Sequence, residues 1–564
     1  MTLNQLTKLI RTTVAQTLGE GLDEQRLDVS LSAEAQFGDY STNAAMVYAK
    51  DLKRPPRLLA EQLARALSEA SQEIERTEVA GPGFINIWLT NEAVAAAASD
   101  AQHFESQVYA GQRMVVEYSD PNPFKPLHAG HLYTTLVGDV VARLLDRGGA
   151  KVVRVSYGGD VGLHVAKSLW AILRDLGGEN PQKLADVPAA ERSAWMGERY
   201  VEGNAAYDDE AAARQEIIEI NKRIYRLHAE KDQTSAFAKI YWTCRQWSYD
   251  YFPTLYDQLG VVKFDRVIPE SEVTGRGIEA VRKQLAAGIY ELSDGAVVFR
   301  GEPYGLHTRV FINSHGLPTY EAKDVGLLLT KWKDYHFDRS IVITAIEQEQ
   351  YMAVMLKSVE QFEPEPARRS GHLTHGTVKL AGGIKMSSRR GNIVEALDIL
   401  SAATRAAQKV SAAATHDTVL AAVKYAFLKQ RIGGDIIYDP AESVSLEGNS
   451  GPYLQYAHAR ARSILAKGHG SLKGKLGELD PAERVLAAKI AEYADVVQRS
   501  VEELRPHYIA TYLYELAQSF NRFYEASRVI GDARESHRLQ LVRLYADVLS
   551  SGLEVLGIVA PDRL

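Results

Sequence analysis

The sequence predicts an α/β protein with three domains: a small α+β domain, a larger domain built on a parallel β-sheet, and an all-α helical bundle. Its 564 residues are too many for a single hydrophobic core. Between residues 106 and 410, strand-like apolar runs alternate with helical patterns, as in a parallel sheet with crossover helices. From residue 411 onward the pattern is almost wholly helical. The predicted domains are therefore 1–105, 106–410 and 411–564.

The composition is that of a globular protein in a reducing compartment. Hydrophobic residues make up 46% of the chain, and no apolar run reaches the roughly 18 residues that a membrane-spanning helix needs. The N-terminus has the pattern of an amphipathic helix rather than an export signal. The single cysteine, Cys244, excludes an intramolecular disulfide and a multi-cysteine zinc site. We expect a cytoplasmic protein that does not bind membranes.

The net charge of −7 argues against a general nucleic-acid coat protein. It leaves room for an RNA partner, because RNA docking needs local basic patches rather than a basic total.

The first domain is predicted from strand and turn signals. Residues 27–31 alternate like a strand, and Pro55 and Pro56 stand at a helix start. Residues 37–43 read as a turn that leads into a helix, and residues 80–86 as a turn that leads into a strand. Ordinary loop chemistry is enough to explain both turns.

The larger domain is organised around a histidine-containing loop. A short apolar strand, 114–116, precedes a segment that three prolines keep extended, and a helical pattern begins at Leu132. Between them lies His-Ala-Gly-His, residues 128–131, whose small central residues let a phosphorylated group approach the backbone. A helix N-terminus adds unpaired N–H groups and the positive end of its dipole. Alone, the two histidines could equally be surface residues or a metal pair.

A second loop, residues 382–392, is flanked by glycines and carries three cations and two hydroxyls. Glycines combined with lysine and arginine suit a loop that closes over a polyphosphate. Taken alone, it could be an ordinary basic surface loop.

Further strands place a glycine-rich turn beside the histidine loop. Residues 151–157 are predicted to be the second strand, and they run into the turn 158–162. Ligands bind parallel sheets at the carboxyl ends of strands, where this turn and the histidine loop both lie. Residues 170–290 are predicted to be a helical insertion whose aromatic residues fall on several helical faces, which favours core packing. Strands around a turn are expected at 295–312, and a buried central strand at 340–345.

The helical bundle contains one helix with an ambiguous face. Residues 451–462 place aromatic and basic side chains on one helix. Such a face suits RNA, because aromatic rings stack on bases and arginine holds phosphates. It equally suits a packed helix with a solvated edge. Residues 480–483 carry a cap, a proline and an acid in the order of a helix start.

Together, the two loops resemble the HIGH and KMSK motifs of class I aminoacyl-tRNA synthetases, in the right order and at about the expected distance. The whole chain is similar to the bacterial arginyl-tRNA synthetases. The matching stretches are FGDYSTN, AGPGFIN, VEYSDPNPFKPLHAGH, YEAKD, KMSSRRGN, AVKYAFLKQ, LEGNSGPYLQYAHARARSI, FNRFYEASRVI and RLQLVRLYADVLSSGLEVLGIVAPDRL. They run essentially from end to end, so chance is a poor explanation.

The resemblance implies a Rossmann-like class I synthetase catalytic domain. An N-terminal domain would touch the tRNA elbow, and a C-terminal domain would read the anticodon. The implied reaction is ATP-dependent ligation of L-arginine to the 3′ end of tRNA(Arg) through an arginyl-adenylate, with release of AMP and pyrophosphate. Mg²⁺ would accompany ATP, and no residue is assigned to a protein-bound metal. In this family tRNA is usually required for the adenylate step, and we expect a monomer.

The resemblance also implies roles for single residues. The implied catalytic residues are His128, His131, Lys125, Lys385 and Arg389, which would stabilise the ATP phosphates and the leaving pyrophosphate. The implied ATP-binding residues are His128, Gly130, His131, Lys385, Met386, Ser387 and Ser388. The implied arginine-binding residues are Glu117, Asn122, Tyr320, Asp324 and Gln348. The implied tRNA-binding residues are Tyr453, Gln455, Tyr456 and Arg460.

These arginine-binding positions have the right chemistry. A guanidinium is a planar fork that carboxylates and a hydrogen-bonding aromatic residue bind well. Tyr320 and Asp324 are four residues apart on a predicted helix and therefore share a face.

The chain departs from the family pattern at four places. Ser388 replaces the second lysine of KMSK, and Lys125, just before the histidine motif, is expected to substitute for it. Tyr133 stands where arginine is common, and Val161 where tryptophan is usual. Residues 347–351 read EQEQY in place of DQxxHF, which bears on Gln348.

Two alternatives remain at this point. A class I synthetase for cysteine would need zinc-binding cysteines, and one for glutamine or glutamate would not place two carboxylates in its side-chain pocket. A non-catalytic tRNA-binding paralogue would have no need of His128, His131 and Lys385.

Overall fold

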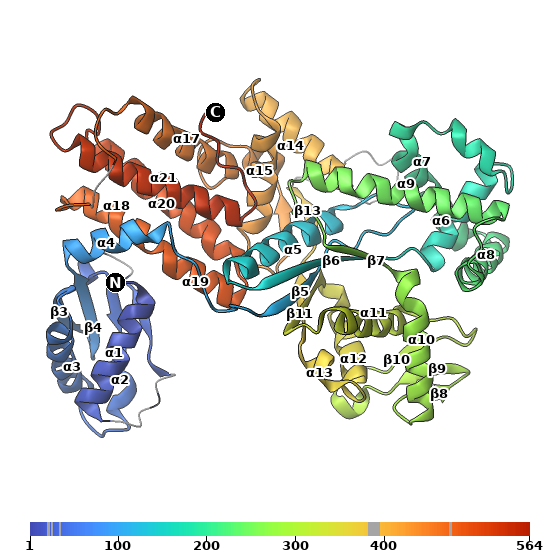
Figure 1. Ribbon diagram of the computed structural model, residues 1–564, viewed down its shortest axis with the longest axis horizontal. Coiled ribbons are helices and arrows are strands. Elements are labelled where there is room, and N and C mark those ends of the chain that lie inside the picture. The colour runs from blue at the N-terminus through green and yellow to red at the C-terminus, as the bar shows by residue number, and fades with distance from the viewer. Residues whose placement is uncertain (20–22, 24–25, 33–34, 382–394, 473–475) are drawn as a thin grey trace.

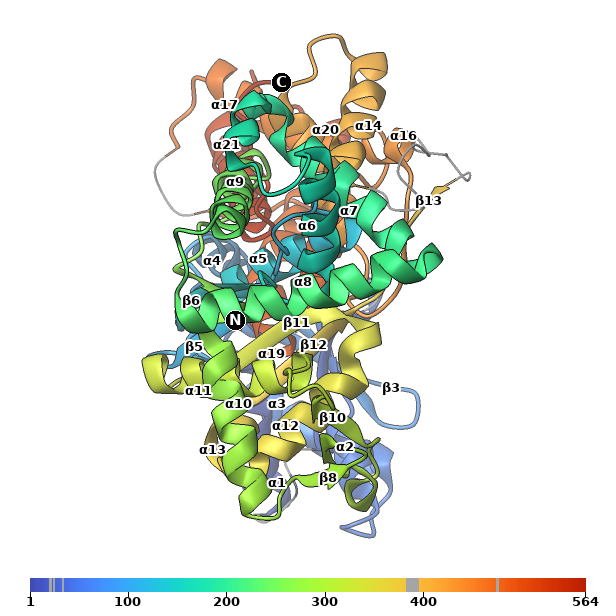
Figure 2. The same ribbon diagram turned by 90° about the vertical axis from the view of Figure 1, so that its right-hand side faces the viewer.

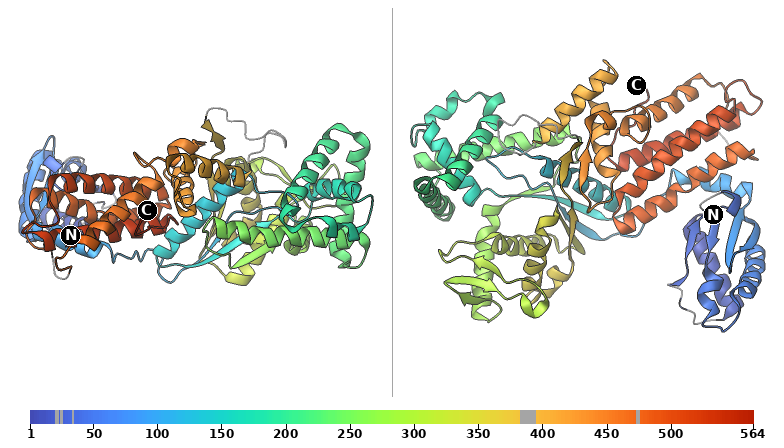
Figure 3. Two further views of the ribbon diagram at one scale, coloured as in Figure 1. Left: turned by 90° about the horizontal axis from the view of Figure 1, so that it is seen from above. Right: turned by 180° about the vertical axis from the view of Figure 1, so that it is seen from behind.

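The computed structural model describes the whole chain apart from residues 20–22, 24–25, 33–34, 382–394 and 473–475. Figure 1 shows an N-terminal domain in blue, a central sheet surrounded by helices, and a bundle of long helices in orange and red. The N-terminal domain lies against the bundle, as Figure 3 shows from above and from behind. No helix in the described ranges is long and apolar enough to cross a membrane.

The N-terminal domain is a four-stranded antiparallel sheet, ordered β1-β2-β4-β3, with helices packed on it. Its elements are α1 (Leu3–Leu18), β1 (Val29–Leu31), β2 (Tyr40–Thr42), α2 (Ala44–Ala49), α3 (Pro56–Ala70), β3 (Ile74–Ala80), β4 (Phe84–Leu89) and α4 (Asn91–Ala101). The predicted helix start at Pro56 is confirmed. Residues 40–42, predicted to be part of a turn, form β2 because they pair with both β1 and β4.

The central sheet has five parallel strands in the order β12-β11-β5-β6-β7. Its strands are β5 (Arg113–Glu117), β6 (Lys151–Gly158), β7 (Arg266–Pro269), β11 (Arg339–Ala345) and β12 (Ser370–His375). The predicted parallel sheet and the buried strand at 340–345 are confirmed. β7 lies inside the range predicted for the helical insertion, because residues 266–269 pair with β6 and belong to the sheet.

Helices cover both faces of this sheet. One face packs against α5 (Ala129–Arg147), α14 (Ala396–Val410) and α15 (His416–Leu428). The other face packs against α10 (Glu270–Ala286), α11 (Tyr320–Tyr335) and α12 (Glu349–Glu360). The remaining elements on this side are β8 (Glu291–Ser293), β9 (Ala296–Phe299), β10 (Arg309–Ile312) and α13 (Pro364–Arg368).

The insertion forms a helical subdomain with its own core. Its helices are α6 (Leu163–Asp175), α7 (Arg192–Asp209), α8 (Ala211–Glu230) and α9 (Ala236–Gln258). Figure 2 looks onto this subdomain, which stands in front of the sheet. The predicted packing role of the aromatic residues is confirmed for Tyr241, Trp247 and Phe252, which are buried.

The C-terminal bundle shares a hydrophobic core with the N-terminal domain. Its main helices are α17 (Gly451–Lys467), α18 (Pro481–Ala491), α19 (Tyr493–Glu503), α20 (Pro506–Ala526) and α21 (Glu535–Val555). The capping box predicted at Asp480 and Glu483 is confirmed. The short elements before the bundle are β13 (Val378–Leu380), β14 (Ile436–Tyr438), which pair with each other, and α16 (Pro440–Ser443).

Candidate active site

The two histidines form the cap of α5. His128 is the N-cap residue, and its Nδ1 accepts a hydrogen bond from the Gly130 N–H at 3.1 Å. His131 Nδ1 accepts from the His128 N–H at 3.3 Å, and the two ring centroids are 3.8 Å apart. A Cβ on Gly130 would lie 2.9 Å from the His128 ring, so a side chain there would displace the cap. The motif therefore fixes both rings at one helix N-terminus.

Both imidazoles are neutral near pH 7. Burial, followed by the charge of Lys125, lowers the pKa of His128 to about 4. Burial also lowers the pKa of His131 well below its usual value. Because each Nδ1 accepts a hydrogen bond, each neutral ring carries its proton on Nε2. The two Nε2–H groups are therefore donors, suited to phosphate oxygens at the helix N-terminus.

Lys125 lies close to these rings. Its ammonium is 5.6 Å from the centroid of the Tyr200 ring on α7, and burial lowers its pKa to about 8. It therefore remains largely charged at neutral pH.

The loop before α5 is fastened to the end of β6. Asp120 Oδ1 accepts from the Tyr157 N–H at 2.7 Å, and Asn122 Oδ1 accepts from the Gly159 N–H at 3.1 Å. A Cβ on Gly159 would lie 2.4 Å from Asn122 Oδ1. The predicted glycine-rich turn thus lets two strand-end loops approach closely. On the other side of this turn, Asp160 Oδ1 accepts a hydrogen bond from the Ser271 N–H at 2.8 Å.

Two of the predicted arginine-binding residues meet in what we call the acidic pocket: Glu117, Asp324, Lys331 and Tyr351. Glu117 at the end of β5 and Asp324 on α11 line one small cavity of about 10 Å³, which has room for about one water molecule. Lys331 Nζ lies 2.5 Å from Glu117 Oε2, and the Tyr351 hydroxyl donates to Asp324 Oδ2. A guanidinium needs more room, so side chains here must shift to admit one.

Two carboxyl groups in and beside the acidic pocket, those of Asp324 and Asp120, have raised pKa values. Burial raises the pKa of Asp324 to about 8, with Glu117 and Glu270 adding to the effect. Burial and the charge of Glu117 raise the pKa of Asp120 well above its usual value. Strongly shifted carboxyl groups beside the end of a strand in a parallel sheet are typical of functional sites.

The other predicted arginine-binding residues do not line the cavity between Glu117 and Asp324. Tyr320 begins α11, is 56% exposed, and its ring centroid is 4.9 Å from Lys323 Nζ. Gln348 ends an exposed 3₁₀ turn, Ile346–Gln348, after β11, and its side chain makes no hydrogen bond to any described residue. Asn122, by contrast, faces the glycine turn.

Sequence reasoning missed Lys331, Tyr351 and Tyr157. A signal for Lys331 existed: it lies seven residues after Asp324, two helical turns along the same face. Nothing local marks its pairing with Glu117, which is 214 residues away.

The predicted phosphate loop, with Lys385, Met386, Ser387, Ser388 and Arg389, lies outside the described residues. The chain that follows it is anchored at the histidines. Glu395 forms a β-bridge with His128, and the Ala396 N–H donates to Leu127 O at 2.9 Å. Two departures from the family pattern are buried: Tyr133 packs against His375 with tilted rings whose centroids are 4.4 Å apart, and Val161 is in the insertion core.

Only some of the side chains predicted to bind tRNA are exposed on the helix surface. Tyr456 is 48% exposed, and the Arg460 guanidinium lies 4.5 Å from the centroid of the Tyr524 ring. The Tyr453 hydroxyl accepts from Asn521 on α20 at 3.0 Å. Gln455 corrects the prediction: it is fully buried, and its Nε2 donates to Val559 O at 2.8 Å. Gln455 stands one residue before the exposed Tyr456 on the helix, so its side chain is directed into the bundle.

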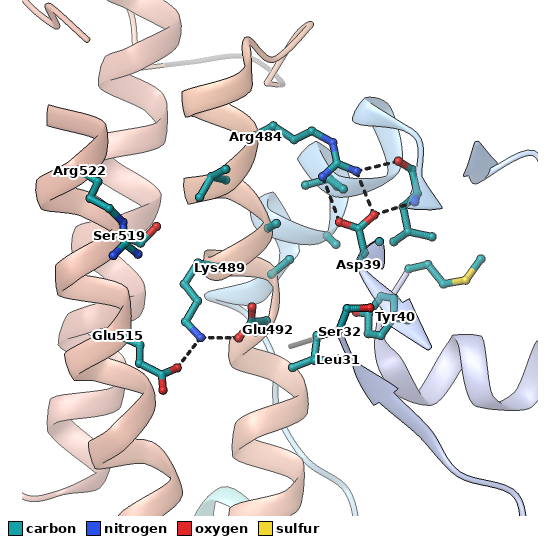
Figure 4. A pocket seen from close by; sticks show the side chains of 18 of the residues that line it. Leu31, Ser32, Asp39, Tyr40, Arg484, Lys489, Glu492, Glu515, Ser519 and Arg522 are labelled. Carbon is teal, nitrogen blue, oxygen red and sulfur yellow. Dashed lines mark hydrogen bonds and ion pairs between the residues drawn. The ribbon is translucent and has the colours of Figure 1, made fainter. Parts of the chain in front are cut away.

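A larger cavity, about 350 Å³, lies between the N-terminal domain and helices α18 and α20. Figure 4 shows its charged lining: Arg484 faces Asp39, and Lys489 lies between Glu492 and Glu515. The Arg484–Asp39 pair crosses the domain boundary, and the Lys489 pairs lie within the helical bundle.

Comparison with known proteins gives one consistent family. Three family models match: "tRNA synthetases class I (R), catalytic domain" over residues 93–440, "DALR anticodon binding domain" over 454–564, and "Arginyl tRNA synthetase N terminal domain" over 4–89. The arginine–tRNA ligase of Flavobacterium psychrophilum is 31% identical over 91% of this chain and 90% of its own length. That of Pseudoalteromonas atlantica is 32% identical over 95% of each. The structure of the Thermus thermophilus arginyl-tRNA synthetase superposes with a TM-score of 0.79, at 25% identity, over the full length of both chains.

Proposed function

This chain belongs to the arginyl-tRNA synthetase family, and we propose that it ligates L-arginine to the 3′ end of tRNA(Arg), using ATP and passing through an arginyl-adenylate. The observation that carries the proposal is the joining of two sites by one loop. The loop from Glu117 to His128 connects the acidic pocket, suited to a guanidinium, with the imidazole pair, suited to phosphates.

In the adenylate step, the arginine carboxylate attacks the α-phosphorus of ATP and pyrophosphate leaves. His128 and His131 would donate their Nε2–H groups to phosphate oxygens, where charge is redistributed in the transition state. Lys125 would add a positive charge beside them. The Nδ1 hydrogen bonds already fix both rings at the helix N-terminus, so little reorganisation of the imidazoles is needed.

Lys385 and Arg389 would neutralise the leaving pyrophosphate, and Gly130, Met386, Ser387 and Ser388 would complete the ATP site. Support comes from the bridge between Glu395 and His128, which brings the chain from this loop directly to the imidazoles. Lys125 would take the part of the lysine that Ser388 replaces.

Arginine would bind through its guanidinium at Glu117 and Asp324, with Asn122, Tyr320 and Gln348 at the rim. The first domain would contact the tRNA elbow. In the helical domain, Tyr453, Tyr456 and Arg460 would contact tRNA, because aromatic and arginine side chains at one helix face suit stacking and phosphate binding. We assign no such contact to the buried Gln455.

Mg²⁺ would enter with ATP. The described residues contain no group of three or more His, Cys, Asp or Glu side chains placed to hold a metal ion. Mg²⁺ commonly binds substrate phosphates together with one or two carboxylates, and it neutralises phosphate charge when bound. We further propose a monomer that acts in the cytoplasm, where light scattering of the purified protein and cell fractionation are the tests.

The deciding experiment is ATP–pyrophosphate exchange with each amino acid, with and without tRNA(Arg). We expect exchange with arginine in the presence of tRNA(Arg), and formation of arginyl-tRNA. A non-catalytic paralogue would bind tRNA without exchange, and a synthetase for another amino acid would exchange with that amino acid instead. Either result would refute the proposed function.

A further inference from the structure

The two carboxylates of the acidic pocket are each bound by an internal donor on one oxygen only. Lys331 holds Glu117 Oε2, and Tyr351 holds Asp324 Oδ2. In the described part of the chain, Glu117 Oε1 and Asp324 Oδ1 accept no hydrogen bond. Glu117 is 3% exposed and Asp324 is 9% exposed. The carboxylate oxygens of buried residues normally find donors, so these two oxygens are available to a ligand.

A third buried oxygen lies on the same face of the sheet as Glu117. The Tyr157 hydroxyl is buried and has no hydrogen-bond partner among the described residues. Val155 pairs with Glu117 across β5 and β6, so Tyr157, two residues further along, is on the same face of the sheet as Glu117. Burial, followed by the charges of Glu270 and Asp324, raises the pKa of Tyr157. An unpartnered buried hydroxyl among carboxylates suggests a missing ligand group.

We propose that Lys331 and Tyr351 are positioning residues that set the specificity for arginine, by holding one oxygen of each carboxylate so that Glu117 Oε1, Asp324 Oδ1 and the Tyr157 hydroxyl receive the substrate guanidinium. The inference rests on the proposed function. It assigns Tyr157 as a substrate-binding residue, and Lys331 and Tyr351 as residues that act through Glu117 and Asp324.

The arrangement selects a guanidinium over similar side chains. A guanidinium presents five N–H donors spread in a plane, which can reach acceptors on three separate residues. A lysine ammonium is a compact point charge that cannot span them. The neutral urea group of citrulline would turn its carbonyl oxygen toward a carboxylate. Both analogues would leave buried oxygens unpaired, which sites built for hydrogen bonding reject strongly.

Lys331 also limits the negative charge of the pocket. The titratable groups around Asp324 are Glu117 from β5, Asp120 from the loop after it, Tyr157 from β6, Glu270 from α10, Lys331 from its own helix α11 and Tyr351 from α12. Without the Lys331 ammonium, the proton that Asp324 already holds below about pH 8 would be bound more tightly, and it must leave when arginine binds. The arginine KM of a Lys331 variant should therefore depend more steeply on pH than that of the wild type.

The test is steady-state charging of tRNA(Arg) by Lys331→Met, Tyr351→Phe and Tyr157→Phe, with arginine varied between pH 6.5 and 8.5. We expect the arginine KM to rise about fivefold to tenfold for each tyrosine variant and more for Lys331→Met, with the ATP KM unchanged. The KM of Lys331→Met should fall more steeply with rising pH, and Lys331→Arg should restore part of the loss. Lysine and citrulline should compete better against arginine in the variants.

Two matched controls separate this role from packing. The Tyr290 hydroxyl donates to Ser358 in the same core, and Lys424 is a buried lysine that donates to the carbonyls of Gly260 and Gly557. Tyr290→Phe and Lys424→Met should lower the unfolding temperature without changing the arginine KM or its pH dependence.

Wild-type arginine KM values in Tyr157→Phe and Lys331→Met would overturn the inference, as would a lower KM in Lys331→Met, since Lys331 would then compete with substrate. If Lys331→Met does not fold, the two tyrosine variants, each lacking one oxygen, decide the question by the same KM criterion. A wild-type protein that charges no tRNA with arginine would instead refute the proposed function.

Discussion

Arg484 on α18 and Asp39 beside β2 form a bidentate ion pair, although they are 445 residues apart in the chain. The guanidinium donates to Asp39 Oδ1 at 3.0 Å and to Asp39 Oδ2 at 2.9 Å. It also donates to Leu89 O, while the Leu89 N–H donates to Asp39 at 2.7 Å. Figure 4 shows this contact at one end of the cavity between the two domains. It ties the end of β4 to the helical bundle.

Breaking this pair should loosen the attachment of the N-terminal domain. Charge-assisted hydrogen bonds with little solvent exposure are typically worth about 1.5–3 kcal/mol, so Asp39→Asn and Arg484→Met should each lower the free energy of unfolding by about that amount. Urea unfolding of the two single variants and the double variant measures the coupling. The double variant should cost less than the sum of the singles, and strict additivity would contradict the pairing.

Loss of His131 should affect the chemical step. Removing one preorganised donor to a developing negative charge typically costs about 10²–10³ in rate, so His131→Ala should lower kcat by that order with little change in the arginine KM. The exposed His103 provides the control, since His103→Ala removes an imidazole far from the motif. Equal kcat values for His131→Ala and the wild type would exclude the phosphate role.

The arginine KM should fall as pH rises. Burial holds the pKa of Asp324 at about 8, so below that pH the carboxyl group is mostly protonated and neutral. A cation binds the ionised form better, so the KM should drop roughly tenfold or more between pH 6.5 and 8.5 and level off above. Asp324→Ala should raise the KM and flatten this profile. A profile that stays steep in Asp324→Ala would assign the titration to another group.

Gly159 should not tolerate a side chain. A Cβ there would lie 2.4 Å from Asn122 Oδ1 and would displace the loop that carries the histidines. Forced crowding of this kind typically costs about 1–3 kcal/mol, and Gly159→Ala should also raise the arginine KM. Gly275 on α10 has open space around its Cβ position, so Gly275→Ala should be neutral or slightly stabilising. Thermal unfolding of the two alanine variants provides the comparison, and equal stability would argue against the close approach.

The exposed face of α17 should contribute to tRNA affinity. Tyr456→Ala and Arg460→Ala should raise the KM for tRNA(Arg) several-fold without changing that for arginine, and Arg460→Ala should reduce the salt dependence of binding. Gln455→Ala is the contrast, because this buried side chain bonds Val559 O and its loss should lower the unfolding temperature instead. Unchanged tRNA KM values in both surface variants would show that this face does not contact tRNA.

Local features of this protein followed from local sequence. The helix start beside the histidines, the Asp480 capping box and the strand at 340–345 each depend on residues within a few positions of one another, so local patterns and spacing predict them. Two of the residues expected to bind arginine, Glu117 and Asp324, line one pocket, because the end of β5 and the first turns of α11 pack against each other.

The sequence by itself determined the alternation of strands and helices in a parallel sheet, the helix start beside the histidines and the class of chemistry, because helix period, turn residues and motif spacing are local properties of the chain. Only the tertiary structure decided which oxygens of the acidic pocket Lys331 and Tyr351 occupy, that Asp39 meets Arg484, and that Gln455 is buried. Periodicity shows which residues share a helix face. It does not show what that face packs against, since partners hundreds of residues away are brought together only by folding.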